Sequence, residues 1–176
     1  MNEKMILVIP DELSSPFFFS AGEPLIVEKD SLKNLNLSIP FLYEAAFFSG
    51  MDAIKPWLMQ EECIPLLLKE WQAEKLILEE LFAKRDRKQA AAPMKKGISL
   101  FLELVYWTNG EPAKLSSTLE FDKLKNKPVN LKERLNFILD RPALYHAFMQ
   151  LTELMTEMEK QYMKQLALKK ASKLQA

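Results

Sequence analysis

The chain has 176 residues, enough for one domain with a sizeable buried core that needs no disulfide or metal ion. Apolar residues make up 48% of the sequence and charged residues 27%, which is ordinary globular composition and excludes a disordered chain. Lys plus Arg number 24 and Asp plus Glu number 24, so the net charge of zero excludes a uniformly basic nucleic-acid-binding protein and an acidic tail.

The net charge of zero is a cancellation between two halves of the chain. Residues 1–83 hold six Lys and no Arg against fourteen acidic residues, a net charge of −8, and residues 84–176 carry +8. Two arrangements explain this split. The halves pack together and partly neutralise each other, or the basic half faces a polyanion while the acidic half faces away.

Residues 1–39 are predicted to form an irregular leader packed on the body. Residues 5–9 and 24–27 are apolar enough to be short strands or extended segments packed on helices, and the prolines of this region prevent a long element. The run Phe17–Phe19 is too apolar for water, and we expect it to anchor the leader to the body.

Helices are predicted from residue 40 onward, in a single helical domain that covers residues 40–176. Ser38 is the expected N-cap of the first helix, whose apolar face spans residues 41–48, and Gly50 is its expected stop. A short turn is expected at Pro56 and Trp57.

Two longer helices follow in the prediction. Pro65 is expected to open a helix that reaches about Lys88, and the run Ala90–Pro93 is expected to break the chain. The next helix should span residues 94–109, with Asn109 and Gly110 at its end.

Residues 111–129 are predicted to be a loop, with one turn around residues 119–122. Asn130 and Glu133 have the spacing of a capping box for a helix that ends at Leu139. Asp140 is then the expected N-cap of a last helix that starts at Pro142.

The last helix has the strongest pattern in the chain, a 4-3-4-3-4 stripe made by Leu144, Phe148, Leu151, Met155, Met158 and Tyr162. A helix from Pro142 to Lys173 would be roughly 48 Å long at 1.5 Å per residue. A compact domain of this chain length is only about 40 Å across. Residues 163–176 should therefore overhang the body, contact a partner or fray. The predicted fold class is all-α, a compact bundle of about five or six helices with a partly extended N-terminal leader and a long C-terminal helix.

Scarce residues exclude several kinds of enzyme. The four glycines lie far apart, so no phosphate-binding loop can form, and we expect no cofactor. Cys63, the only cysteine, is expected to be a small buried or half-buried residue at a helix start, and no intrachain disulfide can form. The longest run without a charge has eleven residues, Pro142–Thr152, too short to span a bilayer. We therefore expect a soluble, cytoplasmic protein with no membrane partner.

The one histidine, His146, has no second metal ligand at a suitable spacing and no nucleophile motif near it. We therefore expect no metal site, and an enzyme that uses His146 with Arg134 or Arg141 ranks as the third functional hypothesis. Glu153 and Glu157 lie four residues apart on the last helix, where they could hold a divalent cation, but pairing of Glu157 with Lys160 is favoured.

A basic stretch between two predicted helices is the main candidate site. It puts six positive charges and one negative charge into thirteen residues, and its cations are Lys84, Arg85, Arg87, Lys88, Lys95 and Lys96. Cations at a helix C-terminus favour the helix dipole, but the last two are expected near a helix N-terminus, where the dipole disfavours them. That position suggests an anion, a phosphate backbone or an acidic partner. No aromatic residue lies within the stretch, so base stacking is not supported.

The C-terminal run 130–160 (NLKERLNFILDRPALYHAFMQLTELMTEMEK) resembles the YpoC-like proteins of low-GC Gram-positive bacteria, as do Pro56 with Trp57, the run Pro65–Trp71 and the run Pro93–Ile98. The resemblance covers about residues 40–162 and contains no catalytic signature, so it assigns no functional residue. It implies a gene context near DNA replication-initiation and base-excision-repair genes.

The leading hypothesis is a non-enzymatic cytoplasmic accessory or adaptor protein that binds a protein partner through the basic stretch and the C-terminal helix. The second hypothesis is a nucleic-acid-binding accessory factor in DNA replication or repair. Its patch would add Arg134 to the six cations of the basic stretch.

Overall fold

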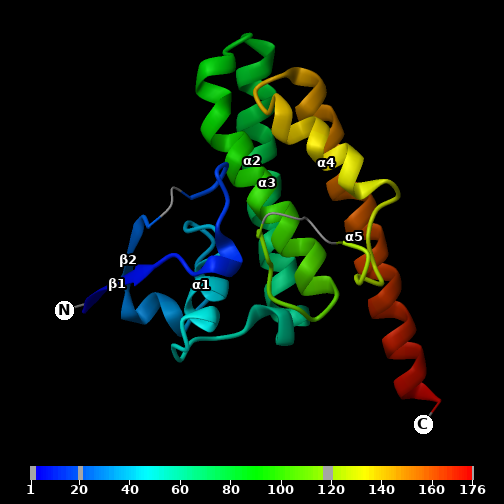
Figure 1. Ribbon diagram of the computed structural model, residues 1–176. Helices are drawn as coiled ribbons and strands as arrows, with labels where there is room; N and C mark the ends of the chain where they lie inside the picture. Colours follow the sequence, from blue (N-terminus) through cyan, green and yellow to red (C-terminus); the bar gives the residue numbers. More distant parts are fainter. Residues whose placement is uncertain (1–2, 20–21, 117–120, 176) are drawn as a thin grey trace.

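The computed structural model describes residues 3–19, 22–116 and 121–175 (Figure 1). These residues are mostly helical, with five α-helices and a small two-stranded sheet at one end of the body. The expected all-α class is therefore correct only as a mostly helical one. The turn expected around residues 119–122 begins outside the described residues.

The extended segments of the leader pair with each other. β1 (Lys4–Val8) and β2 (Pro24–Glu28) run antiparallel, with Ile6 opposite Ile26. Side chains alternate between the two faces of the strands, so Leu7 and Val27 are buried while Ile6 and Ile26 are exposed. Of the two alternatives for these segments, strands are correct.

The phenylalanine run anchors the leader, as predicted. Phe18 and Phe19 are buried, and their rings lie 5.1 and 6.3 Å from the ring of Phe41, the residue before α1. Edge-to-face aromatic contacts of this kind add to the free energy gained from apolar burial.

The first helix, α1 (Leu42–Phe48), begins later than predicted and without Ser38. Phe41 is the N-cap residue, and its left-handed backbone (φ 57°) is not the extended conformation that a side-chain cap requires. The Ser38 hydroxyl instead donates a hydrogen bond to Asn36 Oδ1 at 2.5 Å. The stop at Gly50 (φ 73°) and the short 3-10 turn at Pro56–Leu58 are confirmed.

The boundary between the next two helices is not where it was predicted. α2 (Gln60–Ala83) begins before Pro65, and α3 (Arg87–Thr108) contains the predicted break. The chain turns at residues 84–86, where Arg85 has a positive φ of 56°. The Asp86 carboxylate accepts a hydrogen bond from the Gln89 N–H at 3.1 Å and so caps α3.

A strong preference for helix explains the missed boundary. Ala90, Ala91 and Ala92 are the best helix formers, and burial of Ala90 and Met94 offsets the hydrogen bond that Pro93 cannot make. As a result Lys95 and Lys96 lie inside α3, and the dipole argument that singled them out does not apply.

The last two helices are α4 (Leu131–Asp140) and α5 (Tyr145–Leu174). Asn130 precedes α4 but has a left-handed backbone (φ 55°) and no side-chain cap bond, so the predicted capping box is wrong. Asp140 is the last residue of α4 and does not cap α5, which begins at Tyr145.

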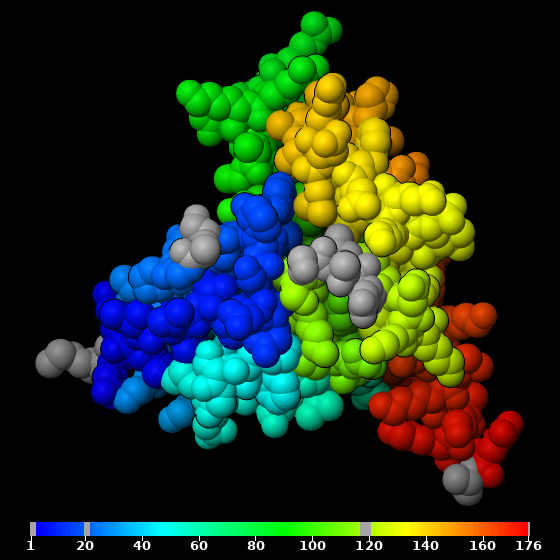
Figure 2. Space-filling view, viewed as in Figure 1, coloured from blue at the N-terminus to red at the C-terminus, as the bar shows by residue number. Residues whose placement is uncertain are grey.

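The apolar stripe on α5 packs on the body. Five of its six residues are buried, and Leu144 is partly buried against the core. Beyond Tyr162 the helix continues with most side chains exposed, and Figure 2 shows its end projecting from the body on the opposite side from the α2–α3 turn.

α3 is the central helix, and it packs against both α2 and α5 (Figure 1). All three helices meet at Gly97. A Cβ atom added at Gly97 would lie 2.8 Å from Trp71 Cζ3 on α2 and 3.1 Å from Leu151 Cδ2 on α5. The absence of a side chain at this position is therefore what allows the close approach of the helices.

We predict that Gly97→Ala lowers the free energy of unfolding by about 1–2 kcal/mol in urea titrations, because overpacking in a close-packed core costs more than the helix propensity gained. Ala91→Gly, at an exposed position of the same helix, calibrates the propensity contribution at roughly 1 kcal/mol. The sign of the change in the free energy of unfolding decides between overpacking and helix propensity, because propensity alone predicts that Gly97→Ala stabilises the protein.

Candidate interaction groove

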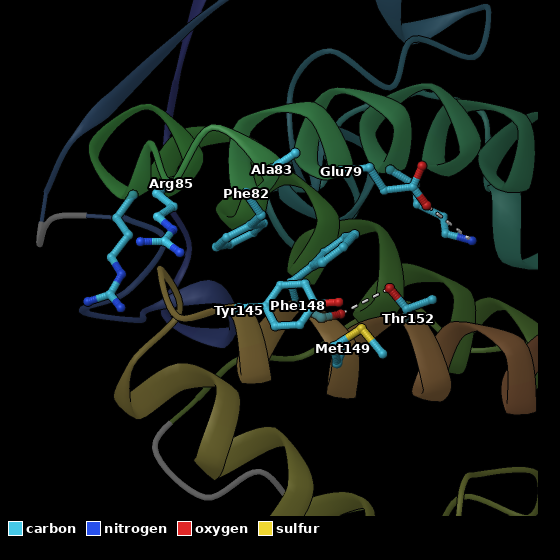
Figure 3. A pocket seen from close by; sticks show the side chains of 10 residues that line it. Glu79, Phe82, Ala83, Arg85, Tyr145, Phe148, Met149 and Thr152 are labelled. Carbon is cyan, nitrogen blue, oxygen red and sulfur yellow. Dashed lines mark hydrogen bonds and ion pairs between the residues drawn. The ribbon is translucent and has the colours of Figure 1, made fainter.

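A cavity of about 960 Å³ opens between the C-terminal half of α2 and the start of α5, with the α2–α3 turn at one end (Figure 3). We call it the α2–α5 groove. Its lining residues are Lys75, Glu79, Phe82, Ala83, Arg85, Arg87, Tyr145, Phe148, Met149 and Thr152. The spacing of these residues is helical in both walls, so each helix presents one continuous face to the groove.

Aromatic side chains join the two walls. The rings of Phe82 and Phe148 stack with centroids 5.2 Å apart and an interplanar angle of 21°. The Tyr145 ring meets Phe82 at 5.9 Å. Tyr145 is 53% exposed and Met149 is 41% exposed, so part of this apolar surface is open to water.

Charges are distributed unevenly along the groove. Lys75 Nζ lies 3.9 Å from Glu79 Oε1, so these two charges compensate each other. At the end formed by the turn, Arg85 and Arg87 are exposed, and within the described part of the chain neither guanidinium has an ion-pair partner. The groove therefore carries its unpaired positive charge at one end.

Two lysines of the predicted basic patch are held in ion pairs with α2. Lys96 Nζ contacts Glu70 Oε1 at 2.5 Å and Glu74 Oε1 at 2.9 Å, both on α2. Lys84 Nζ pairs with Glu80 Oε1 at 2.9 Å. Burial lowers the pKa of Lys96, but the two carboxylates outweigh it and raise that pKa overall.

Arg134 also joins two helices. Its Nη2 lies 2.8 Å from Glu157 Oε1 and 3.9 Å from Glu153 Oε2, so it ties α4 to α5. The two glutamates thus pair with Arg134, whereas Lys160 was the expected partner of Glu157. Lys88 and Lys95 are exposed on α3 and are not part of the groove lining.

The residues of the enzyme hypothesis do not line the α2–α5 groove. His146 is exposed in the first turn of α5, and in the described part of the chain it is not among the residues that line the α2–α5 groove or the four next cavities. Arg141 is exposed and follows the last residue of α4. In the described ranges, no group of three His, Cys, Asp or Glu side chains could hold a metal ion.

Sequence reasoning missed the aromatic part of the groove. Phe148 is part of the predicted apolar stripe of the last helix, and no prediction places Phe82 beside it. Tyr145 and Met149 lie one position beyond the stripe residues Leu144 and Phe148, so they widen the apolar face of the helix. That widening was the available signal.

Two buried carboxylates are the other unusual feature. Glu44 on α1 and Glu103 on α3 are 0% and 3% exposed. The Trp107 Nε1–H donates to Glu44 Oε2 at 2.8 Å and the Ala113 N–H donates to the same oxygen at 3.2 Å, while Oε1 has no partner among the described residues.

Burial shifts the protonation of both groups. Desolvation raises the pKa of Glu44 to about 7, and desolvation together with the charge of Glu44 raises the pKa of Glu103 well above its ordinary value. Glu44 accepts hydrogen bonds from α3 and from the loop that follows it, so it ties α1 to both beneath the surface. Cys63 is also buried, as predicted, and burial raises the pKa of its thiol.

No helix in the described ranges combines the length and the apolar character that crossing a membrane requires.

Comparison with known proteins gives one family. The model of the YpoC-like protein family matches residues 61–170, which contain the whole α2–α5 groove. A protein of Bacillus subtilis (strain 168) named "Uncharacterized protein YpoC" is 38% identical over 123 residues, which cover 67% of this chain and 73% of the relative. No solved structure matches the chain.

We predict that the protein loses stability as pH rises from about 5 to 8. Folded Glu44 keeps its proton up to about pH 7, whereas in the unfolded chain it ionises near its ordinary pKa of 4.5, so the folded state binds more protons in this window. Glu44→Gln keeps an acceptor for Trp107 and removes the ionisation. The free energy of unfolding of this variant should therefore fall by about 2–3 kcal/mol less than that of the wild type over the same pH range.

Urea titrations at each pH measure this difference, with Glu111→Gln as an exposed control that should follow the wild type. Parallel pH profiles for Glu44→Gln and the wild type would contradict the assignment.

Proposed function

The chain belongs to the YpoC-like family, and from this premise and the geometry of the groove we propose that it is a non-enzymatic, cytoplasmic accessory protein that binds a protein partner. The observation that carries the proposal is the α2–α5 groove, a cavity of about 960 Å³ with partly exposed aromatic and Met side chains. Apolar surface of this kind is costly to leave in water and is typical of interaction sites.

The chemistry of the groove supports binding over catalysis. Its ionisable side chains are Lys75 and Glu79, whose charges compensate each other, together with the two arginines and Tyr145. The Thr152 hydroxyl donates to the Phe148 carbonyl oxygen at 2.9 Å. Among the described lining residues, no hydroxyl or thiol is hydrogen-bonded to a His, Asp or Glu side chain.

The exposed end of α5 supports a second contact with the partner. Met163 and Leu168 are 53% and 63% exposed on a helix that extends beyond the body. We propose that residues 163–174 add area to the interface formed at the groove.

One observation favours nucleic-acid binding as the second candidate function. The fold brings the exposed ring of Tyr145 into the same groove as Arg85 and Arg87, a combination of stacking and phosphate contact that the linear sequence lacks. Against this, Lys96 and Arg134 are used in ion pairs between helices, which leaves fewer cations for a polyanion.

We predict that a photo-crosslinking amino acid in place of Met149 captures a defined protein in cells, because this side chain lies in the groove and is 41% exposed. Adding Tyr145→Ala should reduce the yield at least about tenfold, since it removes an exposed aromatic anchor. The same amino acid in place of Leu66, 51% exposed on α2 outside the groove, is the matched control.

The adduct should be identified by mass spectrometry and should be absent for the Leu66 position. The same proteins captured at both positions would reject the groove as the interface. Capture of nucleic acid at Met149, with a yield that falls steeply with salt, would favour the second candidate.

We predict that a chain ending at Tyr162 keeps its fold and binds the identified partner about three- to tenfold more weakly. The removed residues are mostly exposed and the stripe of α5 stays intact, so the loss should be confined to the interface. Isothermal titration calorimetry with the purified partner measures the change, and equal affinities would remove the C-terminal helix from the proposal.

A further inference from the structure

We infer that the α2–α5 groove is directional, and that it binds an amphipathic helical segment of a partner protein whose acidic residues lie beside Arg85 and Arg87. This inference rests on the proposed function and adds the chemistry and orientation of the bound segment. The bound segment is acidic as well as apolar, because its carboxylates complement the charge of the two arginines.

The dimensions of the groove suit two turns of helix. Its α2 wall runs from Lys75 to Ala83 and its α5 wall from Tyr145 to Thr152, which at 1.5 Å per residue is about 10–12 Å. A helix of that length presents apolar side chains at positions i, i+3 or i+4, and i+7, the pattern of helices that bind in hydrophobic grooves.

The aromatic geometry favours inserted side chains over nucleobases. Phe82 and Phe148 stack on each other, so each ring has one face already covered. Tyr145 meets Phe82 at 67°, an edge-to-face contact. The surface left open includes Met149, which adapts to inserted apolar groups of different shapes.

The turn end of the groove is built to receive negative charge. Arg85 and Arg87 are exposed there without ion-pair partners in the described chain, and guanidinium groups bind carboxylates in a bidentate way. At the other end of the groove, the charges of Lys75 and Glu79 compensate each other, so that end favours neither positive nor negative groups.

The backbone adds to this asymmetry. α5 starts at the groove with no side-chain cap and no acidic residue in its first turn, so no side chain of that described turn offsets its partial positive charge. The opposing C-terminal carbonyls of α2 are already used: Glu80 and Leu81 accept from the N–H groups of Lys84 and Asp86 at 3.1 and 2.9 Å. The nearby Asp86 carboxylate caps α3.

The test uses the full chain and two labelled synthetic peptides of about four helical turns. Both carry Leu at positions i, i+4, i+7 and i+11, and they differ only in having Glu or Lys at the other positions. Fluorescence polarisation should give an affinity for the Glu peptide at least about tenfold above that for the Lys peptide.

A charge exchange provides the decisive comparison. The double variant Arg85→Glu, Arg87→Glu should reverse the preference, so that the Lys peptide binds better. The control double variant Lys88→Glu, Lys95→Glu makes the same change in net charge outside the groove and should leave the preference unchanged. All four positions are exposed, and circular dichroism checks that both variants stay folded.

Several results would overturn the inference. They are equal affinities for the two peptides, no binding of the Glu peptide up to millimolar concentration, reversal by the control variant, and tighter binding of oligothymidylate than of the Glu peptide. If crosslinking at Met149 still captures a protein whose bound segment is not acidic, the proposed function stands and only this inference fails.

Discussion

The contact of three helices at Gly97 is the constraint on which the rest of the structure depends. α3 packs against α2 and α5, and at Gly97 the approach is so close that a single methyl group would overlap Trp71. The same two outer helices supply both walls of the α2–α5 groove. Their separation at the groove is therefore set by how α3 holds them, and the groove is a fixed feature of the packed core.

The opposite charges of the two halves have two roles in this fold. Part of the charge is used internally, since Lys96 of the basic half pairs with Glu70 and Glu74 of the acidic half. Part is left at the surface, where Arg85 and Arg87 stand at the end of the groove. The ion pairs of Lys96 hold α3 against α2, and the two exposed arginines give the groove its proposed direction. The first explanation of the charge split, neutralisation between the halves, therefore applies to Lys96, and the second stays a proposal for Arg85 and Arg87.

The features that could be predicted from the sequence are those that depend on residues close together in the chain. The stripe on α5 and the burial of Phe18 and Phe19 follow from apolar spacing. Predictions that needed a backbone angle or a distant partner failed. Asn130 cannot cap with a left-handed backbone, and the preference of the alanine run for helix outweighed Pro93. The partners of Lys96 lie on another helix, 26 residues away for Glu70, and Trp107 is 63 residues from Glu44, so no spacing rule could find them.

The central claim is that the α2–α5 groove binds a partner segment at a rigid and directional site. Amide chemical-shift mapping of the isotope-labelled full chain with the Glu peptide tests it most directly. The account predicts that the largest shifts cluster in residues 75–87 and 145–152, while the amides near Gly97 stay unchanged. Largest shifts on the sheet of β1 and β2, or shifts spread through α3, would contradict it.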